Sequence, residues 1–103
     1  MYIETAGGDK WVSQDVTVTN NEYYFLGIWV KAPSAGAVTL ALQDHYSYAD
    51  IASVSCPGTG VWEYLRLFAR PTTVRSGFNN ARVRIHVHAP AYAYVSNVRI
   101  DLI

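Results

Sequence analysis

The segment from Arg82 to His88 alternates strictly between two kinds of side chain, and this alternation constrains the fold more than any other feature. Val83, Ile85 and Val87 are apolar, whereas the residues between and around them are arginines and histidines. Successive side chains of a strand point to opposite faces, so the pattern predicts a strand with one buried face and one cationic or protonatable face. Such a face is expected to meet an anionic or hydroxyl-rich ligand or another subunit, with a plain solvent-facing surface as the alternative.

The same period of two residues runs along most of the chain, and no segment shows a helical period. Strands are predicted wherever an alternating or continuous apolar run ends at a Gly, Pro or Asn turn. These runs are residues 12–18, 23–31, 38–42, 51–55, 61–70 and 92–103, the last with a bulge near Ser96-Asn97. Short strands at even spacing predict an all-β fold, an antiparallel β-sandwich or jelly roll. At 103 residues, the chain is expected to form a single domain over residues 1–103.

Composition narrows the functions that such a fold can serve. The chain has 8 basic and 8 acidic residues, and its net charge of zero argues against general nucleic-acid binding. No apolar run approaches the roughly 20 residues of a membrane-spanning helix, and the first residues lack the basic and apolar regions of a signal peptide. The single Cys56 excludes an internal disulfide. We therefore expect neither nucleic acid nor a membrane as the partner.

Several short motifs follow one another in an order that resembles a known series. They are residues 14–18 (QDVTV), 24–32 (YFLGIWVKA), 36–40 (GAVTL), 59–65 (TGVWEYL) and 93–100 (AYVSNVRI). In this order they are similar to the β-sandwich carbohydrate-binding modules of families four, nine and twenty-two, which are attached to cellulases and xylanases. The resemblance implies a non-catalytic sandwich that binds glycans. Short β-domains with few charges also resemble the C-terminal tips of phage tail fibres and tailspikes, which are trimers that bind surface glycans.

Two differences from that family concern metal binding and the core. Family members usually begin with an additional N-terminal segment that carries an acidic calcium ligand, whereas this chain starts close to the strand at residue 14. They also commonly have an Asp where this chain has Ser96. Both differences remove oxygen ligands, of which calcium needs about 6–8, so no structural calcium or other cofactor is predicted. The short start also predicts an uncovered sheet edge or core flank for a parent polypeptide or sister subunit to fill, and the final strand is expected to be a natural C-terminus.

A set of aromatic, arginine and histidine residues forms the candidate ligand site. Sugar-binding surfaces combine aromatic rings, which stack on pyranose faces, with planar hydrogen-bonding side chains. By strand parity, we predict that Phe25 lies behind one shared outer face that carries such a set. Its members are Trp29, Tyr64, Arg66, Arg84 and His86. A second packed face or a subunit interface is the alternative, because Trp, Tyr and Arg also mark protein contacts.

Further aromatic residues are assigned to the rim and to the core edge. Tyr46 and Tyr48 lie in a polar loop and are predicted rim contacts of the ligand, with a plain exposed loop as the alternative. Trp62 opens its predicted strand directly after a glycine turn, and we interpret it as a plug at the edge of the core. Trp11 is interpreted in the same way.

His86 and His88 project from the same side of their predicted strand, because they are two residues apart. Two histidines can begin a metal site, for which Asp44 and His45 are further candidate ligands. We predict hydrogen-bonded surface imidazoles and no metal site, since the sequence fixes no third ligand. No enzyme is predicted either, because no nucleophile lies beside a base and no carboxylates form a fixed pair.

The sequence thus favours a non-catalytic glycan-binding module of a larger polysaccharide-directed protein, such as a phage tailspike, a tail fibre or a glycoside hydrolase. Its arginines favour an acidic glycan, because a guanidinium pairs with a carboxylate through two hydrogen bonds. The alternative is a structural or trimerisation module at the C-terminus of a phage tail protein, without independent sugar binding. In both cases we expect an extracellular or virion-associated location, and either a homo-oligomer or contact with a parent polypeptide.

Overall fold

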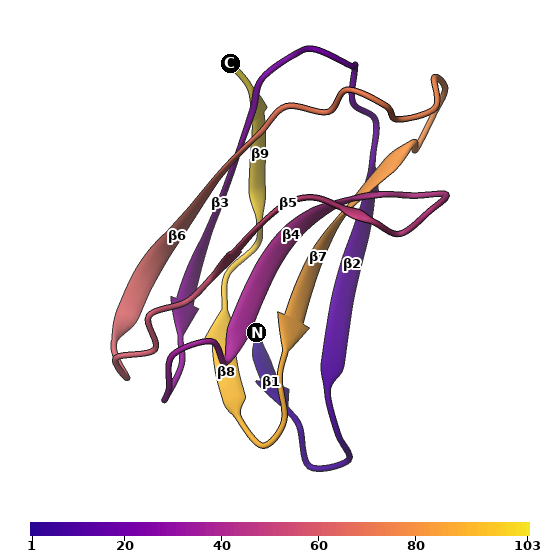
Figure 1. Ribbon diagram of the computed structural model, residues 1–103. Coiled ribbons are helices and arrows are strands. Elements are labelled where there is room, and N and C mark those ends of the chain that lie inside the picture. The colour runs from indigo at the N-terminus through magenta and orange to yellow at the C-terminus, as the bar shows by residue number, and fades with distance from the viewer.

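The computed structural model describes residues 1–103 as nine β-strands in two antiparallel sheets that pack face to face (Figure 1). The strands are β1 (Tyr2–Glu4), β2 (Lys10–Val16), β3 (Tyr24–Lys31), β4 (Val38–Asp44), β5 (Asp50–Ser55), β6 (Trp62–Ala69), β7 (Ala81–Val87), β8 (Tyr92–Val95) and β9 (Arg99–Leu102). This architecture confirms the predicted antiparallel β-sandwich. The chain contains no helix long and apolar enough to cross a membrane.

The chain passes repeatedly between the two sheets. The four-stranded sheet has the order β2-β7-β4-β5, and the five-stranded sheet has the order β1-β8-β3-β6, with β9 also paired to β3. The predicted last strand is therefore two short strands, which meet β3 at Val30–Lys31 and at Tyr24–Gly27. Ser96 fixes the break between them against β3. The Trp29 N–H donates to Ser96 Oγ (3.0 Å), and the Ser96 N–H donates to the Trp29 carbonyl (2.9 Å).

Inward-facing residues of both sheets form one core between the layers. Its fully buried side chains include Leu26, Ile28, Val30, Leu40, Leu42, Val83, Val87 and Val95. On β7, Val83, Ile85 and Val87 are buried, and the arginine and histidine side chains between them are partly exposed, as the alternation predicts. Burial of each large aliphatic side chain stabilises the fold by about 1.5–3 kcal/mol, so this alternation holds the two layers together.

A buried amide joins two long connections at one end of the sandwich. Asn80 Oδ1 accepts from the Val18 N–H, and Asn80 Nδ2 donates to the Val18 carbonyl, each over 2.8 Å. Asn80 is only 2% exposed, so water competes little for these bonds. The same residue accepts the His45 N–H at its backbone carbonyl (3.1 Å). The connections before β3, after β4 and before β7 are thereby tied together.

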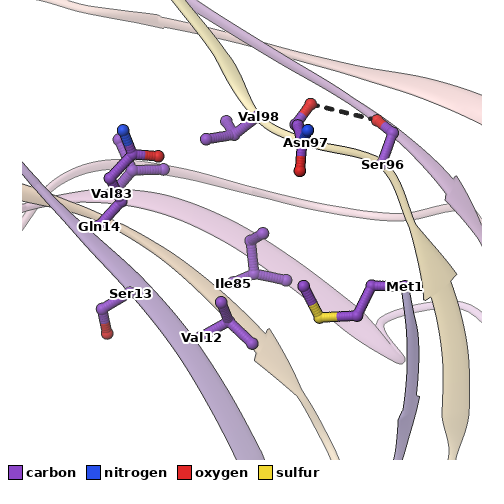
Figure 2. A pocket seen from close by; sticks show the side chains of 9 residues that line it. All are labelled: Met1, Val12, Ser13, Gln14, Val83, Ile85, Ser96, Asn97 and Val98. Carbon is purple, nitrogen blue, oxygen red and sulfur yellow. Dashed lines mark hydrogen bonds between the residues drawn. The ribbon is translucent and has the colours of Figure 1, made fainter.

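One flank of the sandwich stays open between the sheets. A hollow of about 110 Å³ lies there. Figure 2 shows the side chains that line it, from β2 and β7 on one side and from the link between β8 and β9 on the other. Its apolar lining comes from Met1, Val12, Val83, Ile85 and Val98.

Candidate functional site

The predicted site residues do not share one face of the molecule. Trp29, Tyr64 and Arg66 lie on the outer face of the five-stranded sheet, whereas Arg84 and His86 lie on the outer face of the four-stranded sheet. Strand parity separates inward from outward residues, but it does not tell which sheet a strand joins. Since β7 pairs with β2 and β4, the prediction of one shared face is wrong, and the molecule has two separate candidate surfaces.

The first surface, which we call the polar groove, crosses the outer face of the four-stranded sheet. Its side chains come from paired positions of β2, β7, β4 and β5 and from the loop after β4. They are Trp11, Thr39, Ala41, Gln43, Tyr48, Asp50, Arg82, Arg84 and His86. The groove contains a hollow of about 120 Å³. Ala41 has the smallest side chain of its lining and leaves room between longer polar neighbours.

Arginine side chains pack on the aromatic rings of the polar groove. The guanidinium carbon of Arg84 lies 4.9 Å from the centre of the Trp11 ring, and that of Arg82 lies 4.3 Å from the centre of the Tyr48 ring. At these distances the cations are attracted to the ring faces. The groove therefore presents aromatic and cationic groups in contact with one another.

A polar chain runs across the groove beside these rings. Arg82 Nε donates to Gln43 Oε1 (2.9 Å), and Gln43 Nε2 donates to Asp50 Oδ1 (2.7 Å). Burial lowers the pKa of Arg84, and the neighbouring Arg82 charge lowers it further, while Asp50 acts in the opposite direction. Because burial and a like charge both disfavour the cation, an anionic ligand would stabilise Arg84 at this position.

The loop after β4 orients one of the two predicted rim tyrosines toward the groove. Asp44 Oδ1 at the end of β4 accepts the Tyr46 N–H (2.8 Å), which starts a tight turn. Tyr48 then has a left-handed backbone (φ 60°), and its ring meets Arg82 in the groove. Tyr46 instead packs on Arg75 of the connection before β7, with 4.3 Å between the guanidinium carbon and the ring centre. Tyr48 thus borders the groove, whereas Tyr46 faces a different arginine.

A cluster of Asp9, His86 and His88 closes the groove at its other end. His86 Nε2 lies 2.8 Å from Asp9 Oδ2, and His88 Nδ1 lies 3.9 Å from the same oxygen. The Ala89 N–H donates to Asp9 Oδ1 (2.7 Å). This backbone bond is the main cause that lowers the pKa of Asp9, and the hydrogen bond with His86 contributes further. The carboxylate and the two imidazoles are residue types that bind transition metals.

The sequence-based candidates for additional metal ligands are wrong. His45 lies beside Asp15, with 3.4 Å between His45 Nδ1 and Asp15 Oδ1. Asp44 pairs with Ala81 at one end of the ladder between β4 and β7, whereas His86 pairs with Thr39 near the other end. Asp44 and His45 therefore lie far along the sheet from the histidine pair, and the sequence analysis does not identify Asp9.

The second surface, which we call the aromatic face, covers the outer side of the five-stranded sheet. Its rings are Tyr2, Phe25, Trp29, Trp62, Tyr64, Phe68, Tyr92 and Tyr94. Neighbouring rings pack against one another with centres 4.9 to 6.5 Å apart. Several of these rings are strongly exposed, including Trp29 (49%) and Phe68 (64%). The surface is thus a broad layer of rings.

Three of the predicted site residues do gather on the aromatic face. The ring centre of Tyr64 lies 5.1 Å from that of Trp29 and 6.4 Å from that of Phe25. The guanidinium carbon of Arg66 lies 5.3 Å from the Tyr64 ring centre. The Tyr64 side chain lies over Gly27 of β3, and a Cβ atom at residue 27 would clash with its phenol group. The absence of a side chain at Gly27 therefore leaves the space that the Tyr64 ring occupies beside Trp29.

Trp11 and Trp62 do not plug the edge of the core, so that prediction is wrong. Each is 49% exposed. Trp11 pairs with His86 in the polar groove, and Trp62 pairs with Lys31 on the aromatic face. The sequence pattern does not determine whether a residue next to a turn points into the core or out of it. The pairing of each strand with its neighbour places both indoles on the outer face. Both tryptophans therefore belong to the candidate surfaces.

Comparison with known proteins identifies relatives by fold. No protein-family model matches the chain, and no curated protein matches its sequence. A CBM4 protein matches with a TM-score of 0.70 and 13% identity, over 90% of this chain and 73% of its own. The chain has the β-sandwich fold of carbohydrate-binding modules. This result confirms the fold that the resemblance implies.

Two other solved structures widen the range of proteins that use this fold. A cyclase from Fischerella sp. TAU matches with a TM-score of 0.70 and 12% identity, over 99% of this chain and 62% of its own. Tailspike protein 4 of bacteriophage CBA120 matches with a TM-score of 0.64 and 20% identity, over 98% of this chain and 15% of the tailspike chain. This sandwich corresponds to only part of either protein, and identities this low establish the fold alone.

Proposed function

We propose that the chain is a non-catalytic glycan-binding module and that the glycan binds in the polar groove. The observation that carries this proposal is the hollow beside Ala41, which Arg84 and Gln43 line. Arg84 packs on the Trp11 ring, and Gln43 accepts a hydrogen bond from Arg82, which packs on the Tyr48 ring. Sugars offer hydroxyl groups to planar polar side chains and apolar C–H faces to aromatic rings. The fold likeness to a CBM4 protein and to a phage tailspike supports this assignment.

An acidic glycan fits this groove better than a neutral one. Arg82 and Arg84 are two residues apart on the same face of β7, so the groove carries two positive charges, of which Arg84 lines the hollow itself. Guanidinium groups bind carboxylates through two parallel hydrogen bonds. A ligand carboxylate would also relieve the repulsion between the two arginines. Such a module would act outside the cell or on a virion, as part of a larger polysaccharide-directed protein.

A matched pair of arginine substitutions tests the proposal. Arg84→Ala removes a groove arginine, and Arg66→Ala removes an arginine from the aromatic face. After an array of neutral and acidic glycans identifies a ligand, calorimetry should show that Arg84→Ala weakens acidic-glycan binding by about 10- to 100-fold, the loss of a charged hydrogen bond. Arg66→Ala should leave the affinity unchanged, and added salt should reduce the Arg84 effect. A wild-type chain that binds no glycan, or a larger loss from Arg66→Ala, would contradict glycan binding in the groove.

Self-association through the aromatic face is the second candidate function. It is favoured by the exposed layer of rings, in which Trp29 and Phe68 offer large apolar areas. Contiguous exposed apolar area and buried aromatic anchors are typical of protein interfaces. The occupant that we propose is a second copy of the chain, as in a structural or trimerisation module. Sedimentation equilibrium decides the matter, since a discrete oligomer supports the second candidate and a monomer at all concentrations excludes it.

A further inference from the structure

Three side chains with metal-binding atoms converge at the end of the polar groove. Asp9, His86 and His88 each place one ligand atom within 4.8 Å of the other two. We propose that these residues bind a divalent transition-metal ion of the Zn²⁺ class. This inference goes beyond the proposed function, because it concerns an ion that the chain would bind without any glycan.

Backbone pairing brings the three ligands together. His86 and His88 belong to β7 and its immediate continuation, and both side chains leave the outer face of the sheet. Trp11 of β2 pairs with His86, and continuing this antiparallel register by two residues places Asp9 opposite His88. The pairing of β2 with β7 therefore fixes the site: the two histidines come from β7 and its continuation, and Asp9 directly precedes β2.

The distances between the ligand atoms suit a small ion. Asp9 Oδ2 lies 2.8 Å from His86 Nε2 and 3.9 Å from His88 Nδ1. Nitrogen and oxygen ligands of tetrahedral Zn²⁺ lie about 2.0–2.1 Å from the ion, which places them roughly 3.3 Å from one another. The two observed separations fall on either side of this value, so small side-chain rotations would complete the site. The side chains of His88 and Asp9 are 38% and 36% exposed, which leaves room for water in the remaining coordination positions.

Surrounding groups already orient the ligands. The Ala89 N–H holds Asp9 Oδ1 and leaves Oδ2 directed at the histidines. His88 uses its other ring nitrogen, Nε2, to contact Thr39 Oγ1 (2.9 Å), which in turn lies 3.0 Å from Ser55 Oγ. Partners of this kind fix the orientation of a ligating imidazole and increase metal affinity.

The composition of the site selects the class of ion. Calcium and magnesium prefer ligand sets made of oxygen, whereas two imidazoles with one carboxylate suit Zn²⁺ and its first-row neighbours. A simple histidine–aspartate hydrogen bond accounts for the contact between Asp9 and His86, and the Thr39 contact orients the His88 ring, but neither one uses His88 Nδ1, which faces the same Asp9 oxygen. The three-ligand site accounts for both contacts.

Titration of ZnCl₂ into the chain, prepared without a histidine tag, tests the site by calorimetry in a buffer free of chelators. We expect saturable binding of one Zn²⁺ per chain and no binding of CaCl₂. His88→Ala and Asp9→Asn should each weaken Zn²⁺ binding by at least about 10- to 100-fold, because loss of even an outer-shell partner of a ligand has an effect of this size. His45→Ala is the matched control, because His45 lies beside Asp15 as a single histidine–aspartate pair. The Zn²⁺ affinity of this variant should equal that of the wild type.

Thermal unfolding provides a second measurement and checks that each variant folds. Because a ligand that binds only the folded state stabilises it, ZnCl₂ should raise the Tm of the wild type and of His45→Ala, and should raise the Tm of His88→Ala by less at the same ZnCl₂ concentration. If His88→Ala does not fold, His88→Asn takes its place in both measurements. The site is overturned if the wild type shows no saturable Zn²⁺ binding, or if the His88 and His45 variants bind equally well. Since no glycan is present, neither result depends on glycan binding.

Discussion

The polar groove and the aromatic face both expose tryptophan, tyrosine and arginine, but they arrange these residues in opposite ways. In the groove, rings pack with guanidinium groups, as Trp11 does with Arg84. On the aromatic face, rings pack mainly with other rings, as Trp29 does with Tyr64 (5.1 Å between centres). Where rings alternate with charged side chains, the charged groups can still form hydrogen bonds with a hydroxylated ligand. A layer of rings instead offers apolar area, so the neighbours of an aromatic residue indicate its partner better than its residue type does.

The largest expected effect comes from the core that both surfaces share. Ile28→Ala in the five-stranded sheet and Leu40→Ala in the four-stranded sheet each remove a fully buried side chain. We expect each to lower the free energy of unfolding by about 2–5 kcal/mol through lost burial and a new cavity, as measured by urea denaturation. Ser53→Ala, at an exposed position of β5, should change it by at most about 0.5 kcal/mol. If only one of the two core variants lost this much unfolding free energy, the polar groove and the aromatic face would not share a common core.

Trp29→Ala tests the aromatic face alone. If this face joins copies of the chain, loss of an exposed tryptophan anchor should weaken self-association by about 2 kcal/mol or more, measured by sedimentation equilibrium. Glycan affinity should not change, because Trp29 lies on the opposite sheet from the groove. A loss of glycan binding in this variant would move the sugar site to the aromatic face and reverse the comparison.

Trp11→Ala is the reciprocal change and is expected to have the smallest effect. It removes the ring that packs with Arg84, so glycan affinity should fall by about 0.5–1.5 kcal/mol, the usual contribution of one aromatic contact. Calorimetry with the glycan found for the wild type measures this loss, and self-association should remain unchanged. An unaltered affinity would show that the sugar does not stack on Trp11.

Much of the fold could be predicted from the sequence because burial follows local alternation. The apolar residues of β7 enter the core, and Trp29 faces away from Ile28 on β3, as parity requires. The grouping of outward residues could not be predicted in this way. It depends on which strands pair, and these pairings join segments far apart in the chain.

The candidate site shows the same limit at the level of single residues. The spacing of His86 and His88 is visible in the sequence, but Asp9 meets His86 across a separation of 77 residues. Nothing local to Asp9, which follows two glycines in a turn, indicates this contact. The antiparallel register of β2 against β7 creates it, together with the exposure of Trp11.

The Asn80 clamp has a consequence for the ordering of the groove. Its side chain holds Val18, and its carbonyl holds the His45 N–H at the start of the loop that carries Tyr48. Because the clamp is buried, the base of this loop is anchored before any ligand arrives. The proposed glycan binding would therefore cost less conformational entropy at Tyr48 than it would with an untethered loop. The Val18 amide, which lies outside every strand, should exchange its hydrogen slowly and report the opening of this end of the sandwich.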